Sequence, residues 1–323
     1  MKRSLLLCFT AVLLVTPCAA GDDLPLLTEV SVISTLDGES QPVLYWAPES
    51  AARQPTVLFV FLHSWSSDYR QDNSKWQREA VKRGWIYLHA NFRGANRSPQ
   101  ACGSRFARRD ILDAIDFATQ KFNVDGSRVY LAGVSGGGHM AMLMAGHHPD
   151  RFSAVSAWVG ISDLSEWYRF HVKDGKPQKY AQMILKSFGR PPGEDAMTDA
   201  EYRDRSPLFH MHRVGDLPVD IHAGVNDGHA GSVPVRHSLS AFNEIARTHG
   251  SEQVTDVEME ALWTARQLKN PKPSDTAEDS SYGRKIVLRR MSQQSRVTIF
   301  DGGHESLVTP ACDWLAEHRR LVR

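Results

Sequence analysis

Short apolar runs, separated by polar stretches, extend along most of this 323-residue chain. Residues 56–63 (TVLFVFLH) form a continuous apolar run, which is typical of a strand covered on both faces. The pattern recurs at 85–92, 127–133, 152–160, 217–224 and 295–303, and runs at 28–34 and 41–48 indicate edge strands.

Between these strands, apolar residues recur at helical spacing. The clearest case is RRDILDAIDFATQKF at 108–122, where charged positions lie opposite an apolar stripe. Helices are predicted at about 72–83, 106–122, 138–147, 235–248 and 309–320. Strands that alternate with helices predict an α/β fold, a mainly parallel twisted sheet with helices on both faces.

Two stretches interrupt the alternation. Residues 163–215 are predicted to form a helical insertion, and residues 250–294 are polar and contain KNPKPSDTAEDSS, the most loop-like segment of the chain. Because no internal repeat is visible, we expect a single domain over residues 21–323 that carries both insertions.

The first 20 residues have the pattern of an export signal. Two basic residues precede an apolar run at 5–15 that is too short to span a bilayer, and small residues then lead to Ala20. We expect cleavage after Ala20 and a secreted or periplasmic protein. A lipoprotein anchor at Cys18 fits poorly, because a proline directly precedes this cysteine.

The charge of the chain argues against several classes of partner. The net charge is +1, and loss of the two basic residues in the export signal changes it to about −1. No run of Lys and Arg is dense enough for nucleic acid, and no later stretch is long and apolar enough to cross a membrane. A small-molecule or glycan-linked substrate is the partner class that we expect.

The segment YLAGVSGGGHMA at 130–141 contains the first candidate for chemistry. Ser135 follows an apolar strand and precedes a helix, which is the setting of a nucleophile elbow, and four nearby glycines leave room for the tight turn. The elbow places the Ser135 hydroxyl at a helix N-terminus, where the backbone N–H of Gly136 faces a developing oxyanion. A glycine-rich helix start with a capping serine is the alternative without chemistry.

A serine nucleophile needs a base and an orienting acid, which follow it in the order Ser, Asp or Glu, His in folds with this elbow. Asp227 lies just past a predicted strand in a glycine-rich loop, and His304 follows the last predicted strand after two glycines. Asp301 and His229 are rivals, but Asp301 directly precedes the His304 loop, and His229 shares the loop of Asp227.

The loop after the first buried strand should supply a second oxyanion donor. Its sequence is HSWSSD, and we expect the backbone N–H of Trp65 to complete the hole with that of Gly136, while His63 braces the loop. Trp65, Trp167 and Tyr168 are candidates to line the mouth of a substrate pocket.

Two cysteines, Cys102 and Cys312, lie outside the export signal. They either form a disulfide in an oxidising compartment or stay as two buried thiols. His222, Asp227 and His229 have donor types that suit a metal, but His222 lies within a predicted strand. We expect neither a metal nor a cofactor.

These motifs resemble the α/β-hydrolase superfamily and, more narrowly, the catalytic domain of the prolyl oligopeptidase family and its stand-alone esterase relatives. The resemblance covers about residues 54–323, and its motifs are ANFRGANRS, GVSGGGHMA, the segment from RSPLF to PVRHS, and FDGGHE. It implies an α/β-hydrolase fold with Ser135 as nucleophile, Asp227 as orienting acid and His304 as general base. The chain departs from the family pattern at Ser64, where relatives have glycine, and by extra residues after Asp227.

The resemblance implies acyl-enzyme hydrolysis of esters or peptides. Peptidases of the family carry an N-terminal propeller, and 35 residues between the export signal and the first core strand leave no room for one. We therefore expect carboxylester hydrolysis, with acetyl or feruloyl esters on polysaccharides as candidate substrates.

Two other functions remain as alternatives. The first is an exopeptidase acting on small peptides, with Glu166 and Arg169 as candidate anchors for a free terminus. The second is a catalytically silent binding protein on the same fold. In each case residues 250–294 join the parts that bear Asp227 and His304, so we expect this segment to approach the rim of the site.

Overall fold

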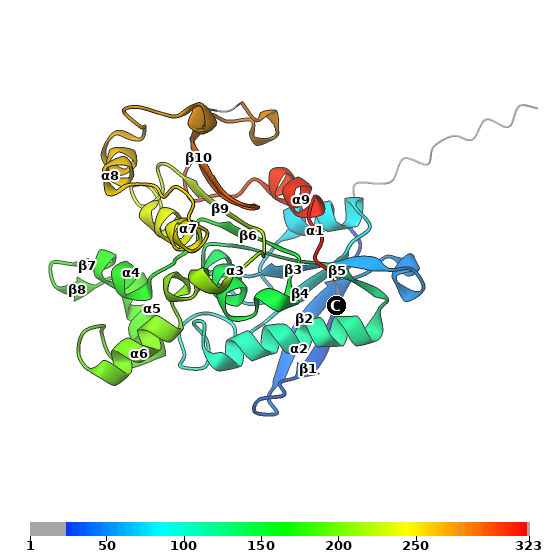
Figure 1. Cartoon of the computed structure of the whole chain (residues 1–323). Helices are drawn as coiled ribbons and strands as arrows, with labels where there is room; N and C mark the ends of the chain where they lie inside the picture. The colour runs from blue at the N-terminus through cyan, green and yellow to red at the C-terminus, as the bar shows by residue number, and fades with distance from the viewer. Residues whose placement is uncertain (1–23, 277, 322–323) are drawn as a thin grey trace, which may run out of the picture.

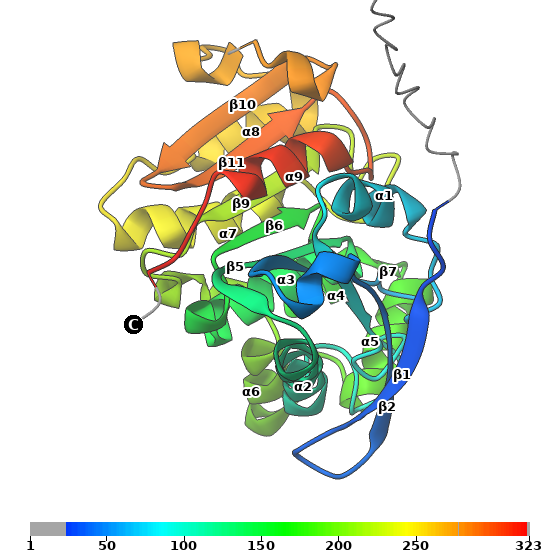
Figure 2. The ribbon, with the colours of Figure 1, turned by 90° about the vertical axis from the view of Figure 1, so that its right-hand side faces the viewer.

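A single sheet of nine strands organises the computed structural model, which describes residues 24–276 and 278–321. The predicted export signal lies outside the described residues. The strand order is β1-β2-β4-β3-β5-β6-β9-β11-β10, and Figure 2 shows β1 and β2 at one edge and β10 and β11 at the other. The strands of this sheet are β1 (Thr28–Ile33), β2 (Ser40–Trp46), β3 (Thr56–Leu62), β4 (Ile86–Ala90), β5 (Val124–Val134), β6 (Ala154–Trp158), β9 (Val219–Gly224), β10 (Ile286–Ser292) and β11 (Ser295–Phe300).

The six central strands, from β4 to β11 in the sheet order, run parallel to one another. Strands β3, β4, β6 and β9 are buried along their whole length, which explains why their sequences are mainly apolar. The outer strands β1, β2 and β10 pair antiparallel with their neighbours. Because the central strands are parallel, the loops at their carboxyl ends meet along one edge of the sheet.

Helices cover both faces of the sheet. Figure 1 shows α1 and α9 together on one side, and α2, α3 and α7 on the other. The helices are α1 (Ser74–Lys82), α2 (Arg105–Lys121), α3 (Gly136–His147), α4 (Leu164–Phe170), α5 (Lys179–Phe188), α6 (Ala196–Asp204), α7 (Arg236–Thr248), α8 (Asp256–Ala265) and α9 (Val308–Ala316). The predicted α/β class and the parallel sheet covered on both faces are confirmed.

The insertion at 163–215 contains α4, α5, α6 and a short hairpin of β7 (Val172–Lys173) and β8 (Lys176–Pro177). Its apolar side chains form a second hydrophobic cluster, separate from the main core, together with Trp65 and Cys102. The insertion therefore packs directly on the loop that follows β3.

The stretch at 250–294 is more regular than its polar composition suggests. It contains α8 and the edge strand β10, neither of which the sequence pattern predicts. Helix α8 begins with a capping box, in which the Thr255 side chain accepts from the Glu258 N–H and the Glu258 carboxylate accepts from the Thr255 N–H. Strand β10 places Arg290 inside, where it pairs with the buried Asp275.

Candidate active site

Ser135 lies at the turn between β5 and α3, at the carboxyl edge of the sheet. Its backbone adopts φ 59° and ψ −115°, a conformation that a residue with a side chain rarely adopts and that costs about 1–3 kcal/mol. The Ser135 N–H donates to the Trp158 carbonyl at 2.8 Å, and the Ser135 carbonyl accepts from the His139 N–H at 2.9 Å. These bonds hold the strained turn in place. The side chain of Ser135 accepts no capping hydrogen bond from α3, so the capping role is not the one it plays.

The backbones of Gly136 and Trp65 lie against each other. A Cβ atom at Gly136 would come within 2.3 Å of the Trp65 nitrogen and 2.4 Å of its Cα, so only glycine fits. Within residues 24–276 and 278–321, no protein group accepts a hydrogen bond from the N–H of Gly136 or of Trp65. The structure therefore brings together two free backbone donors, one of them at the N-terminus of α3.

Neighbouring groups fix the loop that carries Trp65. The Ser64 N–H donates to the Gln71 side-chain oxygen at 2.8 Å, and the Trp65 carbonyl accepts from the Asn96 N–H at 2.9 Å. The backbone groups on both sides of the Trp65 N–H thus form hydrogen bonds, while the Trp65 N–H itself has no partner among the described residues. The Ser64 side chain, which replaces the glycine expected there, points its hydroxyl toward the Val134 carbonyl at 3.4 Å.

His63 braces this loop from beneath. Its ring is fully buried, stacks on Phe92 with centroids 3.8 Å apart, and lies 3.0 Å from the Ser64 carbonyl and 2.7 Å from the Asn91 carbonyl. Burial lowers the pKa of His63, so its neutral ring donates to one of these carbonyls at a time. The expected structural placement of this residue is confirmed.

Asp227 and His304 form a direct pair. The His304 Nδ1 and the Asp227 Oδ2 are 2.7 Å apart, and the aspartate is fully buried. The other carboxylate oxygen, Oδ1, accepts from the backbone N–H of Gly228 at 2.9 Å and of Val233 at 3.1 Å. The backbone joins the two loops as well, because the Asn226 N–H donates to the Gly302 carbonyl.

The residues between Asp227 and Val233 wrap around this pair. Gly231 lies so close that a Cβ atom there would be 2.1 Å from the Asp227 Oδ1 and 2.8 Å from the His304 Cβ. The sequence shows the extra residues but not this contact, so the requirement for glycine at 231 was missed. The extra residues after Asp227 therefore do more than lengthen the loop, because they pack directly against Asp227 and His304.

Both insertions hold the loop at 227–233. From the first insertion, Trp167 Nε1 and His171 Nε2 lie 2.7 and 2.9 Å from the Ser232 carbonyl. From the second, the Trp263 ring stacks on His229 with centroids 3.7 Å apart. Arg284 of that same segment pairs with Glu305, next to His304, at 2.5 Å. The expectation that residues 250–294 approach the rim is therefore confirmed.

A Ser-His-Asp triad also needs a hydrogen bond between the serine and the histidine, and this bond is not formed in the structure. Among the described residues, no hydrogen bond joins the Ser135 hydroxyl to His304, and a quarter of the His304 side chain is exposed. Catalytic hydrogen bonds are often long without substrate and shorten in the substrate complex. A cavity of about 390 Å³ lined by Ser64, Val134 and Glu305 opens beside these residues.

The three aromatic residues expected at the mouth are buried instead. Trp65 and Trp167 are at most 1% exposed, and their rings pack edge to face with centroids 4.6 Å apart. Tyr168 belongs to the same cluster. The prediction that they line an open pocket is wrong, because the insertion uses them to bury itself against the loop after β3.

Cys102 and Cys312 are both free and buried in the structure, so the second of the two alternatives applies. Cys102 belongs to the cluster of the first insertion, whereas Cys312 lies on α9 in the main core. No disulfide joins the two sulfurs, and the disulfide alternative is corrected accordingly.

The rival residues have other partners. Asp301 is exposed, and His229 contacts Trp263 rather than a carboxylate. His222 is buried in β9, with Nε2 2.6 Å from Asp220, so it is not part of a metal site with Asp227.

One cluster has donor types that suit a metal ion, namely His147, Asp204 and His210, whose ligand atoms lie within 4.8 Å of one another. However, the Arg108 guanidinium already binds the Asp204 carboxylate at 2.9 and 3.0 Å. Both imidazoles also lie within 3.2 Å of the Asp204 carbonyl. The positive charge of Arg108 opposes a cation here, and we assign this cluster to packing between α3 and α6.

Comparison with known proteins agrees with this geometry. The model of the prolyl oligopeptidase family matches residues 72–266, which include Ser135 and Asp227 and make up more than half of the chain. The chain belongs to the prolyl oligopeptidase family. Members of this family are serine hydrolases, and His304 lies beyond the matched segment.

The relatives that this chain matches include both peptidases and esterases. The chain is 26% identical to acylamino-acid-releasing enzyme 1 of Oryza sativa over 200 residues, which cover 55% of this chain and 24% of that enzyme. It is 28% identical to an acetylxylan esterase of Coprinopsis cinerea over 128 residues, covering 36% of this chain and 34% of that one. The matches thus span about a quarter to a third of the length of these relatives.

Solved structures show the same fold. The acylaminoacyl peptidase of Pyrococcus horikoshii matches 90% of this chain and 39% of its own, with a TM-score of 0.57 and 17% sequence identity. At this identity the likeness establishes the α/β-hydrolase fold and no more. In addition, no described helix is both long and apolar enough to pass through a bilayer.

Proposed function

We propose that this protein hydrolyses carboxylic esters through an acyl-enzyme intermediate. Ser135 Oγ attacks the ester carbonyl carbon while His304 Nε2 takes its proton. His304 then returns the proton to the leaving alcohol, and water releases the acyl group by the same steps in reverse. Asp227 orients the ring, because its Oδ2 accepts from the Nδ1–H and leaves Nε2 free as a base.

The observation that carries the proposal is the pair of free backbone N–H groups of Gly136 and Trp65 beside the strained Ser135. A tetrahedral intermediate bears its negative charge on the former carbonyl oxygen, and rigid donors stabilise it most when they lack other partners. A capping serine or a binding scaffold has no need of this arrangement. One such donor contributes about 2.7–4 kcal/mol to lowering the barrier in comparable sites.

We further propose acetyl or feruloyl groups on polysaccharides as the esters. The acetylxylan esterase relative supports this substrate class. The peptidase alternative also has support: Glu166 lines a cavity of about 230 Å³ with Phe170 and Trp263, where its carboxylate is the candidate anchor for a free amino terminus. The acylamino-acid-releasing enzyme shares a longer segment with this chain than the esterase does.

Labelling by a fluorophosphonate, followed by intact mass, tests the nucleophile. We expect one label on the wild type, none on Ser135→Ala, and one on the control Ser281→Ala, which alters an exposed serine of the second insertion. Turnover of p-nitrophenyl acetate should fall at least about 10⁴-fold in Ser135→Ala. A label that survives in Ser135→Ala would refute the assignment.

Substrate class needs a separate comparison. Release of acetate or ferulate from decorated xylan is measured against cleavage of dipeptide arylamides. Faster cleavage of the arylamides, with loss of that activity in Glu166→Gln, would favour the peptidase alternative. We also propose that the protein is exported, and N-terminal sequencing of the mature protein should find residue 21 first.

A further inference from the structure

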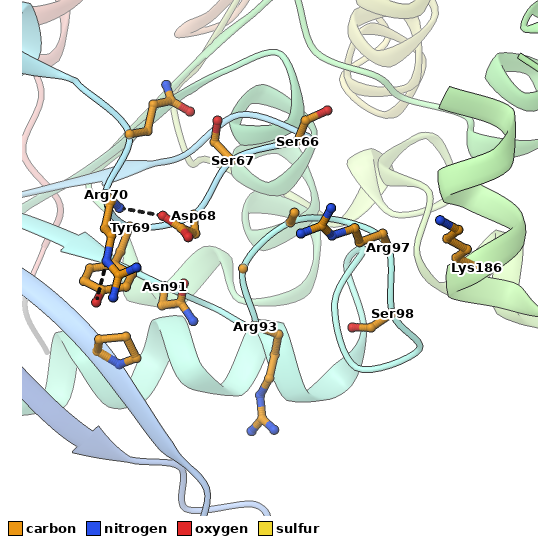
Figure 3. A pocket seen from close by; sticks show the side chains of 14 residues that line it. Ser66, Ser67, Asp68, Tyr69, Arg70, Asn91, Arg93, Arg97, Ser98 and Lys186 are labelled. Carbon is orange, nitrogen blue, oxygen red and sulfur yellow. Dashed lines mark hydrogen bonds between the residues drawn. The ribbon is translucent and has the colours of Figure 1, made fainter. Parts of the chain in front are cut away.

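A large polar cavity opens beside the loop that follows β3 (Figure 3). Its volume is about 890 Å³, and it is lined mainly by the loops after β3 and β4, together with Lys186 of α5. The walls carry the hydroxyls of Ser66, Ser67 and Ser98 and several charged groups. Little in this lining suits an apolar acyl chain, whereas hydroxyls, amides and charges suit a hydrated, polar ligand.

Positive charge exceeds negative charge in this cavity. Arg93 is neutralised by Asp37 at 2.8 Å and by Asp110 at 2.5 Å. In the part of the chain that the structure describes, however, neither Arg97 nor Lys186 forms an ion pair or a side-chain hydrogen bond.

Figure 3 shows Arg97 pointing into the cavity and Lys186 extending toward it from α5. Arg70 contributes a third positive charge, and its guanidinium donates to the Tyr69 hydroxyl at 3.1 Å. Asp68 is the acid of the described lining, and its carboxylate accepts from the Arg70 N–H. Because Arg93 is already neutralised, the lining carries three further positive charges and only the one negative charge of Asp68.

The cavity adjoins the proposed oxyanion hole through the backbone. Ser66, which lines it, directly follows Trp65, and Asn96, which directly precedes Arg97, donates its N–H to the Trp65 carbonyl at 2.9 Å. The Asn96 side chain in turn accepts from the Cys102 N–H at 2.7 Å, so the turn before Arg97 is held from both sides. The residue whose N–H is the proposed second oxyanion donor is therefore next in sequence to the cavity lining and hydrogen-bonded to the turn that carries Arg97.

We propose that the cavity binds the carboxylate of a uronic-acid unit in an acylated acidic polysaccharide, with Arg97 and Lys186 as its specificity-determining residues. The inference rests on the proposed esterase function and narrows its substrate from glycan esters in general to those on acidic glycans. A guanidinium forms a bidentate pair with a carboxylate, and the serine hydroxyls can form hydrogen bonds with the hydroxyls of a sugar ring. The negative charge of Asp68 repels the carboxylate of the uronic acid.

Binding to the inactive variant Ser135→Ala tests the charge preference without turnover. Calorimetry compares a xylo-oligosaccharide that carries one glucuronic acid with the neutral oligosaccharide of the same length. We expect Arg97→Gln and Lys186→Gln each to weaken binding of the acidic sugar by about 2–5-fold, as for exposed ion pairs, and Asp68→Asn to strengthen it. Raising the salt from about 0.05 M to about 0.5 M should reduce the preference.

Two control variants match these changes in charge. Lys179→Gln removes an exposed lysine from the same helix as Lys186, and Arg105→Gln removes an exposed arginine at the start of α2; neither residue lines the cavity. Both should leave the preference unchanged.

Equal affinity for the acidic and neutral sugars would overturn the inference, and so would a preference that survives the double change at Arg97 and Lys186. Tighter binding of a free peptide carboxylate than of the uronate would also overturn it. Turnover of p-nitrophenyl acetate by the wild type tests the proposed function independently. Turnover without a charge preference refutes the inference alone, and a charge preference without turnover refutes the esterase proposal alone.

Discussion

Replacing Gly231 by alanine tests whether the loop at 227–233 sets the geometry of the acid–base pair. The new methyl group would lie 2.1 Å from the Asp227 Oδ1 and 2.8 Å from the His304 Cβ. Ordinary contacts between such atoms lie at about 3.5 Å, so the carboxylate, the histidine or the loop must move by more than about 1 Å. The carboxylate cannot rotate away cheaply, because two backbone N–H groups and His304 hold its oxygens.

The size of the effect follows from this displacement. A shift of about 1 Å in a catalytic group costs about 10²-fold in rate, which corresponds to about 2.7 kcal/mol in the barrier. Complete loss of the orienting acid costs about 10⁴-fold and sets the upper limit. We therefore expect kcat/KM for p-nitrophenyl acetate to fall by about 10²-fold in Gly231→Ala, mainly through kcat.

A neighbouring glycine provides the matched control. Gly303 directly precedes His304, yet a Cβ atom there would meet no atom within 4 Å, so Gly303→Ala should stay within about 3-fold of wild type. Urea unfolding of both variants separates lost geometry from lost folding, since crowding by one methyl costs about 1–3 kcal/mol in stability. The reasoning fails if folded Gly231→Ala labels with fluorophosphonate as fast as the wild type.

Three further predictions concern the rest of the molecule. Burial raises the thiol pKa of Cys102 and Cys312 to about 12, so in the mature protein both should react with a disulfide reagent only after unfolding; reaction of the native protein would contradict their burial. Trp167→Ala should lower the free energy of unfolding by about 3–5 kcal/mol in urea titrations, because it empties the centre of the second cluster; a loss below about 1 kcal/mol would show that the cluster can collapse. The hydrogen bond from Arg93 lowers the pKa of Asp37 from 3.8 to about 2, so its contribution to stability is complete above pH 3.8 and is lost as the pH falls toward 2. Melting temperatures measured across this range should fall more steeply for the wild type than for Asp37→Asn, and parallel curves would contradict the assignment.

The central sheet could be predicted from the sequence because its strands are buried on both faces. Strand β3 is apolar at every position after Thr56, and the eight predicted strands correspond to β1, β2, β3, β4, β5, β6, β9 and β11. Strand β10 escaped prediction because its sequence, IVLRRMS, contains two arginines. Arg290 is nevertheless buried, since Asp275 and Glu258 supply carboxylates from outside the strand. Such tertiary pairing has no counterpart in local sequence.

The candidate site also has features that local sequence predicts and features that depend on tertiary contacts. Ser135, Asp227 and His304 are the candidates from the sequence because each lies just past a strand, and parallel strands bring these positions to one edge. The exposure of Trp65 and Trp167 could not be predicted, because an aromatic residue packs equally well on a partner segment or at a pocket mouth. The role of Gly231 also depends on how its loop folds back over Asp227, which no periodic pattern encodes.

The attachment of the acid loop to both insertions limits how far this enzyme can be treated as modular. In a modular hydrolase, the segments that choose the substrate can be exchanged while the chemical machinery is left intact. Here Trp167 and Trp263, one from each insertion, contact the seven-residue loop at 227–233 that holds the Asp227 carboxylate. A chimera that replaced either insertion with that of a relative would therefore change the rate of the chemical step together with substrate choice. Such a chimera would have to include the loop at 227–233 from the same relative as the insertion.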